Sequence, residues 1–248
     1  MTDPLDLAIC ATCGTQYSTA TPPPTCTICD DPRQYVPPTG QTWTTLRTLQ
    51  TPTPTPTPDT TKTPHYTNII TPLPHNPQIL TLHTTPKLAI GQRAFLLLNP
   101  HGNILWDCLT YLDPATISHI NALGGISAII ISHPHYYNTH LVWAEAFDCP
   151  VYLSAEDREW VMRTEPARQV FWEEREIEVV RGSGIPLPPD DVHNIWKALK
   201  HIAFDQAYGA FVGMDTTGNC KKRLLDSAKI FVKAMGYLDH AIHEEEYS

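Results

Sequence analysis

The chain has 248 residues, of which 42% are hydrophobic, a length that allows one substantial core plus a small additional module. The formal net charge is -9 and no run is rich in lysine or arginine, which argues against nucleic-acid binding because phosphate contacts need a basic face. A membrane span needs about 20 consecutive apolar residues, and no stretch of the sequence approaches that length. The acidic N-terminus lacks the basic and apolar regions of a signal peptide. We therefore expect a cytoplasmic protein.

Four of the seven cysteines lie in residues 1–36, as two CxxC pairs separated by twelve residues. They are Cys10, Cys13, Cys26 and Cys29. Two such pairs can place four thiolates around one ion, and four ligands fill the coordination shell of zinc, leaving no position for water. The spacing therefore predicts a small structural zinc module, similar to a zinc ribbon, whose metal replaces a core that ~30 residues cannot build.

The same four cysteines could also be in other chemical states. Two disulfides, free buried thiols and an iron site with the same ligands are alternatives. Redox-active dithiols are a further one, although a thioredoxin-like CxxC motif normally occurs once, beside a βαβ unit. Cys108, Cys149 and Cys220 lack metal-binding spacing, so we expect them to be small buried apolar side chains.

Residues 37–87 are crowded with threonine and proline and include four consecutive Thr-Pro pairs at 51–58. Proline removes a backbone donor and fixes φ, so this repeat cannot join the interior of a helix or sheet. We predict an extended loop or linker over residues 37–87.

Residues 88–181 have the pattern of an α/β unit. A helix should begin after Asp113, which can cap it, with Pro114 at the first position. Further helices are expected near Thr139 and at 156–162. Apolar or alternating runs predict strands at 94–98, 104–108, 126–132, 151–153 and 176–180.

Residues 185–248 are predicted to be mostly helical. One helix should be capped by Asp190 or Asp191, and a second should cover 219–238, each with one apolar face. The acidic run 244–246 is expected to be a solvated tail. Together with the α/β unit, these helices predict one domain over residues 88–248.

His133 and His135 directly follow the apolar run 126–132. Two imidazoles one residue apart at the end of a buried strand can both reach one metal ion, and neutral imidazole is a good ligand for zinc or iron. A hydrolytic zinc site, however, needs about three protein ligands and an open position for water.

This pattern resembles the metallo-β-lactamase fold superfamily, and it is most similar to a group in which a short CxxC…CxxC module precedes the hydrolase-like domain. The similarity covers most of the chain, weakly across the Thr/Pro segment. Its most specific part is Ile131–Tyr137, and it also includes residues 26–36, 40–46, 90–93 and 105–108. The resemblance implies a mixed α/β fold, an αββα sandwich, behind a small zinc-ribbon-like module.

The signature of the superfamily is a metal-binding HxHxDH loop at the end of a strand. His133 and His135 match its first two histidines, Tyr137 stands in place of the aspartate, and Asn138 stands in place of the third histidine. His140 is two positions late and is given no ligand role.

Other family ligands are also without a counterpart. Family members carry a later histidine in a Gly-His loop and a later aspartate in a Gly-Asp loop, and neither motif is found here. The run that begins at Ile185 resembles the start of the family's C-terminal region, which implies a truncated domain lacking a segment near 184/185 and strands of the second sheet. Three explanations of the absent segment are open: a natural truncation, a fold completed by a partner, and a gene-model error. His193 and His201 are too far along the chain to be confident replacements.

The implied activity is that of a metal-dependent hydrolase, which uses a metal-activated water on an ester, amide, thioester or phosphoester. His133 and His135 would bind a second zinc or an iron ion, and Asp107, which resembles the aspartate closing an early strand, would orient the site. Asp107 could equally be a turn-former. Tyr136 or Tyr137 could donate a hydrogen bond to an oxyanion, with simple packing as the alternative for both.

Two histidines alone would hold a metal weakly, so we expect activity to be lost or weakened. The alternative function is a catalytically inactive zinc-binding scaffold or interaction protein. A small-molecule substrate is the partner that the hydrolase interpretation implies. A truncated sheet with an unpaired edge would also favour self-association.

Overall fold

The structure is a computed structural model that describes residues 2–30, 36, 38–51, 65–173 and 189–247. The chain divides into two compact units, with the boundary between Glu173 and Glu174. The single domain predicted for residues 88–248 is therefore divided, and most of it belongs to the first unit. No helix in these described ranges has both the length and the apolar character needed to cross a membrane.

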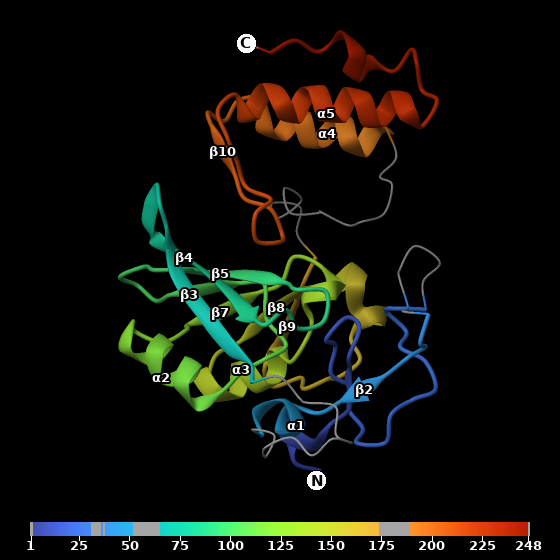
Figure 1. Ribbon diagram of the computed structural model, residues 1–248. Coiled ribbons are helices and arrows are strands. Elements are labelled where there is room, and N and C mark those ends of the chain that lie inside the picture. Colours follow the sequence, from blue (N-terminus) through green and yellow to red (C-terminus); the bar gives the residue numbers. More distant parts are fainter. Residues whose placement is uncertain (1, 31–35, 37, 52–64, 174–188, 248) are drawn as a thin grey trace. The chain divides into compact units, whose positions relative to one another are not determined.

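The first unit is built on one sheet of seven strands in the order β3-β4-β5-β6-β7-β8-β9 (Figure 1). Pairs from β3 to β6 are antiparallel, and pairs from β6 to β9 are parallel. The strands are β3 (Thr67–Leu73), β4 (Asn76–Thr85), β5 (Arg93–Leu97), β6 (Ile104–Trp106), β7 (Ala128–Ile130), β8 (Val151–Ser154) and β9 (Gln169–Trp172).

Two helices, α2 (Pro114–Ala122) and α3 (His140–Phe147), lie against one face of this sheet (Figure 1). Strand register explains why. Leu80, Leu96, Leu105, Ile129 and Val151 are consecutive partners across β4 to β8, so they form one buried apolar row. Alternate residues of a strand share a face, and this row therefore offers the helices a continuous surface.

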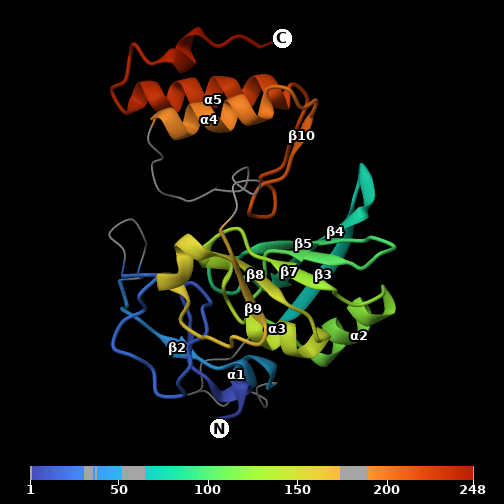
Figure 2. The same cartoon turned by 180° about the vertical axis from the view of Figure 1, so that it is seen from behind.

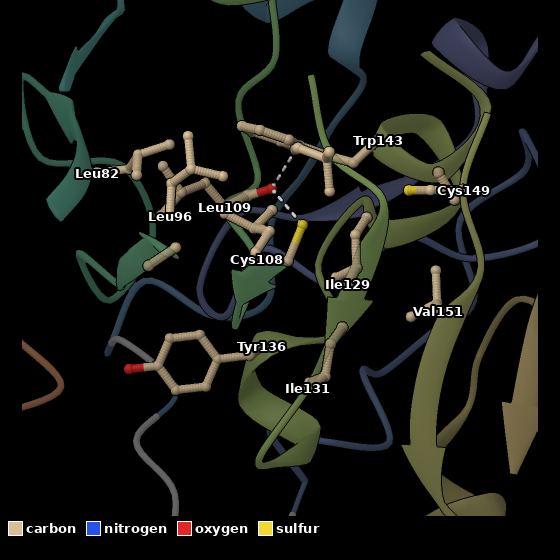
Figure 3. Packing of buried hydrophobic residues seen from close by; sticks show 14 of the residues in the cluster. Leu82, Leu96, Cys108, Leu109, Ile129, Ile131, Tyr136, Trp143, Cys149 and Val151 are labelled. Atoms are coloured by element: carbon tan, nitrogen blue, oxygen red, sulfur yellow. Dashed lines mark hydrogen bonds between the residues drawn. The ribbon is translucent and has the colours of Figure 1, made fainter. Parts of the chain in front are cut away.

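The same core is closed by polar contacts as well as apolar ones. Figure 3 shows the backbone oxygen of Leu109 accepting hydrogen bonds from the Trp143 indole, at 3.0 Å, and from the Cys108 thiol, at 3.6 Å. Cys108 and Cys149 both belong to this core, and Cys220 is buried too, as predicted.

The predicted α/β class with an N-terminal cysteine module is confirmed. The cap of α2 is also as expected: the Asp113 carboxylate accepts a hydrogen bond from the Thr116 amide at 2.8 Å, and Pro114 begins the helix. The helix predicted at 156–162 is present as a shorter 3₁₀ helix, η3 (Ala155–Trp160). The predicted strand at 176–180 and the Thr-Pro repeat beyond residue 51 lie outside the described residues.

The linker predicted over residues 37–87 is wrong for much of its length, because β3 and β4 pair with one another and β4 pairs with β5. Threonine is β-branched and favours strands, and 79–83 alternates between the two faces of the sheet. Pro72 lies in β3, an edge strand, and proline within sheets is tolerated at edges because one side of such a strand has no ladder partner.

The cysteine module also extends past its predicted end at residue 36. Strand β1 (Ile9–Cys10) pairs with β2 (Trp43–Thr44), and helix α1 (Leu46–Gln50) follows. In both Figure 1 and Figure 2 this N-terminal segment lies beside the yellow η3 turn. Trp160 and Met162 pack against the buried cysteines, so the module shares its small core with the sheet domain.

The second unit contains α4 (Pro189–Leu199), the strand pair β10 (Gln206–Ala207) and β11 (Thr216–Thr217), α5 (Cys220–Ala234) and the 3₁₀ turn η5 (Ala241–Glu244). Trp196 and Val192 of α4 pack with Leu225 and Val232 of α5. The prediction of a solvated tail at 244–246 is wrong for Glu245. Its carboxylate accepts a hydrogen bond from Trp196 at 3.0 Å and contacts His193 at 2.9 Å. His201, in contrast, is exposed.

Candidate functional site

The four N-terminal cysteines converge on one point. Their sulfur atoms all lie within 4.8 Å of one another, and all four side chains are buried. The Sγ atoms of Cys10 and Cys29, and those of Cys13 and Cys26, are each 3.7 Å apart. That distance is far longer than a disulfide bond of about 2.05 Å, and it matches the edge of about 3.8 Å of a tetrahedron with metal–sulfur bonds of about 2.3 Å.

Backbone turns hold each pair in place. The Gly14 amide donates to the Cys10 oxygen at 2.8 Å, and the Cys29 and Asp30 amides donate to the Cys26 oxygen at 2.9 and 2.8 Å. Each CxxC segment is therefore a tight knuckle that turns both of its thiols inward. The side-chain amide of Gln41 donates to the Cys10 sulfur at 3.2 Å, a contact suited to a thiolate.

The pKa values of the four thiols move in opposite directions: those of Cys10 and Cys26 fall, and those of Cys13 and Cys29 rise. Hydrogen bonds from neighbouring thiols, that of Cys13 first, hold the pKa of Cys10 far below its usual range. Tyr17 and Trp43, with ring centroids 5.2 Å apart, cover the cluster. These four cysteines can hold one metal ion, and their donor set leaves no position open for a substrate.

His133 and His135 lie on the short segment that follows β7. His133 has extended backbone angles, and the 3₁₀ turn η2 (Pro134–Tyr136) begins directly after it. The two imidazole rings stack with centroids 4.7 Å apart, and their Nδ1 atoms are separated by 3.1 Å. The structure thus brings together the two histidines that the sequence pairs.

The protonation of His133 is fixed by its surroundings. Its Nδ1 accepts a hydrogen bond from the His135 amide at 3.0 Å, so the proton of the neutral ring is on Nε2. Burial, reinforced by His135, lowers the pKa of His133 to about 4. The ring is therefore neutral at pH 7, but its Nδ1 lone pair is already used, so a metal at that nitrogen would have to displace the His135 amide.

Asp107 directly follows strand β6, and its side chain contacts the segment that carries the histidines. It adopts φ 63°, and its carboxylate accepts hydrogen bonds from the amide and the hydroxyl of Ser132, at 2.9 and 2.7 Å. Burial raises the pKa of Asp107 to about 6. Asp107 therefore fixes the residue directly before His133, and it acts as a turn residue at the same time.

Tyr137 lies in the hydrophobic core, 1% exposed, with its ring centroid 5.9 Å from that of His140. Its hydroxyl has no hydrogen-bond partner among the described residues. Burial raises the pKa of Tyr137 well above its usual range. Tyr136, which is labelled in Figure 3, belongs to the same core cluster.

Asn138 occupies the position where the resemblance has a third histidine. Its Nδ2 donates to the Cys108 oxygen at 2.8 Å, and its Oδ1 accepts from Gln92 and Thr110, each at 3.2 Å. The Asn138 backbone oxygen accepts from the Gln16 amide at 3.0 Å. This side chain is therefore used to connect segments of the protein.

His140 is a satisfied core histidine. Its Nδ1 donates to the Tyr137 oxygen at 2.5 Å, and its Nε2 accepts from the Gln169 side-chain amide at 2.8 Å. Burial lowers the pKa of His140 to about 4, so the ring is neutral. Both nitrogens are occupied, which agrees with the sequence interpretation that gave it no ligand role.

Gln92 is the residue that sequence reasoning missed. It is 4% exposed and its side-chain amide donates to the oxygens of Cys13, at 2.7 Å, and His135, at 3.0 Å. A glutamine with no charge and no motif gives little signal in a single sequence. The one clue was its place in residues 90–93, a segment shared with the resembling family.

No protein-family model matches the chain. A curated relative, the uncharacterized protein YmaE of Bacillus subtilis (strain 168), is 45% identical over 166 residues, which are 66% of this chain and 55% of the relative. The chain thus spans about half the length of the curated relative that it matches.

Solved structures of subclass B3 metallo-β-lactamases are similar to the chain, with low sequence identities and low TM-scores. One, described as having an active-site glutamic acid, covers 67% of this chain and 89% of its own, with 13% identity and a TM-score of 0.43. Another, MEM-A1 from a soil metagenome library, covers 40% of this chain and 44% of its own, with 18% identity and a TM-score of 0.32. These values are too low to transfer any residue's role.

Proposed function

We propose that the chain is a zinc protein of metallo-β-lactamase-like lineage with two unequal sites. Cys10, Cys13, Cys26 and Cys29 would hold a structural zinc ion. His133 and His135 would be the remaining part of a hydrolytic metal site that is incomplete. The observation that carries this proposal is Asn138, which stands where the family pattern has a ligand and is engaged in hydrogen bonds.

Zinc is the metal that best suits the cysteine cluster. The 3.7 Å sulfur separations suit tetrahedral thiolate coordination, and the turns that hold the sulfurs are closed by backbone hydrogen bonds. The seven cysteines are free and buried, which suits a reducing compartment and hence the cytoplasmic location expected from the sequence.

The histidine site, unlike the cysteine cluster, has too few ligands to hold a metal ion firmly. Two imidazoles supply fewer than the about three protein ligands of a hydrolytic zinc site. Ser132 holds the carboxylate of Asp107, and the Asn138 amide is committed to Cys108, Gln92 and Thr110. In this proposal a metal at His133 and His135 binds weakly, and hydrolysis is weak or lost.

The test is the metal content per chain, measured by elemental analysis after gel filtration. The wild type is compared with a variant carrying Cys10→Ser and Cys13→Ser, and with one carrying His133→Ala and His135→Ala. We expect about one zinc per wild-type chain, lost only in the cysteine variant. Metal that disappears only in the histidine variant would overturn the assignment of unequal sites.

A second candidate function is an active metal-dependent hydrolase that acts on a small ester, amide, thioester or phosphoester. It is favoured by the neutral ring of His133 and by the position of the His135 ring, whose centroid lies 4.7 Å from that of His133. The measurement is turnover of chromogenic esters and phosphoesters with added zinc or iron. Turnover that is abolished by His133→Ala and retained in Gln78→Ala, an exposed control, would favour this candidate.

A further inference from the structure

The turn between Cys13 and Gly14 lies directly on the segment that carries the histidines. The Cys13 oxygen accepts from Gln92 at 2.7 Å, and the next oxygen, that of Gly14, accepts from the Thr110 hydroxyl at 3.3 Å. Two consecutive carbonyls of a cysteine knuckle are thus bound by side chains of the sheet domain. Both donors, Gln92 and Thr110, also reach the Asn138 Oδ1 atom, at 3.2 Å each, so the single Thr110 proton and the two Gln92 amide protons are shared among these acceptors.

The Gln92 side chain joins the two sites most directly. Its single amide nitrogen donates to the Cys13 oxygen and to the His135 oxygen, at 2.7 and 3.0 Å. Because the side chain is 4% exposed, water does not compete for these bonds. A shift of the knuckle at Cys13 would therefore cost a buried hydrogen bond unless Gln92, and with it His135, moved as well.

A second connection runs through the backbone. The Gln16 amide, two residues beyond Gly14, donates to the Asn138 oxygen at 3.0 Å. The Gln16 side chain in turn accepts from Arg163 at 2.7 Å. The histidine segment is thus bound to the cysteine module at His135 and again at Asn138.

From these contacts we propose that metal binding at the four cysteines positions the segment 131–139, with Gln92 and Asn138 as the positioning residues. When the cysteines hold an ion, the knuckle is fixed and so are its two carbonyl acceptors. When the ion leaves, the thiols are no longer held at one point and the carbonyls lose their fixed place. The proposal concerns the conformation of this segment, and it stands whether or not His133 and His135 bind a metal.

The experiment is hydrogen–deuterium exchange of the full chain, zinc-loaded and after zinc removal by a chelator. In the wild type, removal should speed amide exchange in 131–139 by about tenfold or more, while helix α2 changes little. Gln92→Glu replaces the donor by an acceptor of the same shape. Its segment 131–139 should exchange fast even when loaded, and zinc removal should add little.

Two controls separate this effect from general damage. Gln78→Glu makes the same change of charge at an exposed position of β4 and should behave as the wild type. Sulfur-to-cobalt absorption of the cobalt-substituted chain reports whether the four cysteines still bind metal in Gln92→Glu. We expect this absorption to be retained, since the Gln92 side-chain amide donates to the oxygens of Cys13, His135 and Asn138 and to no cysteine sulfur among the described residues.

The decisive comparison needs no metal removal. If loaded Gln92→Glu and loaded wild type exchange equally over 131–139, the proposal is wrong. It is also wrong if zinc removal leaves the wild-type segment unchanged. Should zinc removal unfold the whole first unit, so that α2 also exchanges fast, the two loaded proteins decide the question alone.

Discussion

Gly14 and Thr110 approach each other so closely that a side chain at Gly14 has no room. A Cβ atom at that position would lie 1.9 Å from the Thr110 Oγ1 atom, and Gly14 also has φ 85°. The contact joins the turn after Cys13 to the loop after β6, and it explains why glycine is required there on two separate grounds.

Gly14→Ala should therefore lower the stability of the first unit by more than the strain of a positive φ alone, because the new Cβ atom also clashes with Thr110. The matched control is Gly40→Ala, since Gly40 has φ 89° and nothing within 4 Å of its would-be Cβ atom. We expect the difference in unfolding free energy between the two variants to be about 1–3 kcal/mol. Urea denaturation of both zinc-loaded variants measures it, and equal losses would refute the steric account.

Asp107→Asn should change how stability depends on pH. Burial raises the pKa of Asp107 from 3.8 to about 6, so between these values the folded protein keeps a proton that the unfolded chain releases. Stability from this group is present at low pH and is lost as pH rises to about 6, by about 3 kcal/mol.

Asparagine does not ionise, so the stability of Asp107→Asn relative to the wild type should rise between pH 4 and 6. Urea denaturation of the zinc-loaded proteins at several pH values provides the comparison. Asp148→Asn, at a side chain that is 92% exposed, is the control. Parallel pH curves for Asp107→Asn and wild type would contradict the prediction.

Gln169→Leu should leave the neutral His140 without its partner. Gln169 donates to the His140 Nε2 atom at 2.8 Å and accepts from the Glu165 amide at 2.8 Å. A buried acceptor that loses its donor costs about 1–3 kcal/mol, and Gln78→Leu at an exposed position serves as control. Chemical denaturation tests this, and a loss no larger than that of the control would show that water replaces Gln169.

Glu245→Gln should loosen helix α4 in the second unit. Its carboxylate contacts Trp196, His193 and Lys200, and the hydrogen bond from His193 leads those that lower the pKa of Glu245 to about 2. The stabilisation is present above the ordinary pKa of 4.5 and is lost as pH falls toward 2.

Amide exchange over α4 at pH 7 measures this effect. We expect faster exchange in Glu245→Gln and no change in Glu244→Gln, since Glu244 is exposed. Equal exchange in the two variants would mean that α4 is held by its apolar face alone.

Local patterns predicted much of the fold. The cysteine spacing predicted the cluster, Asp113 and Pro114 predicted the start of α2, and the apolar run before His133 predicted β7. Each of these signals is carried by residues close together in the chain, so one sequence is enough to see it.

The parts that were missed depend on residues far apart. The contact of Thr110 with Gly14 joins positions 96 residues apart, and that of Gln92 with Cys13 joins positions 79 apart. Such pairs leave no periodicity to detect. Strands β3 and β4 were missed for another reason, since their abundant threonine and proline were interpreted as a linker although 79–83 alternates as a strand does.

The bridge from Gly14 to Thr110 has a consequence for biosynthesis. A ribosome releases the four cysteines well before residues 110 and 138, so the N-terminal knuckles can capture an ion while the sheet is still being made. Closing a loop of 96 residues carries an entropic cost, and a knuckle already rigid lowers what remains to be ordered when Asn138 arrives. Supply of the ion, which we propose to be zinc, should therefore govern the yield of native chain during translation, separately from the stability of the finished molecule.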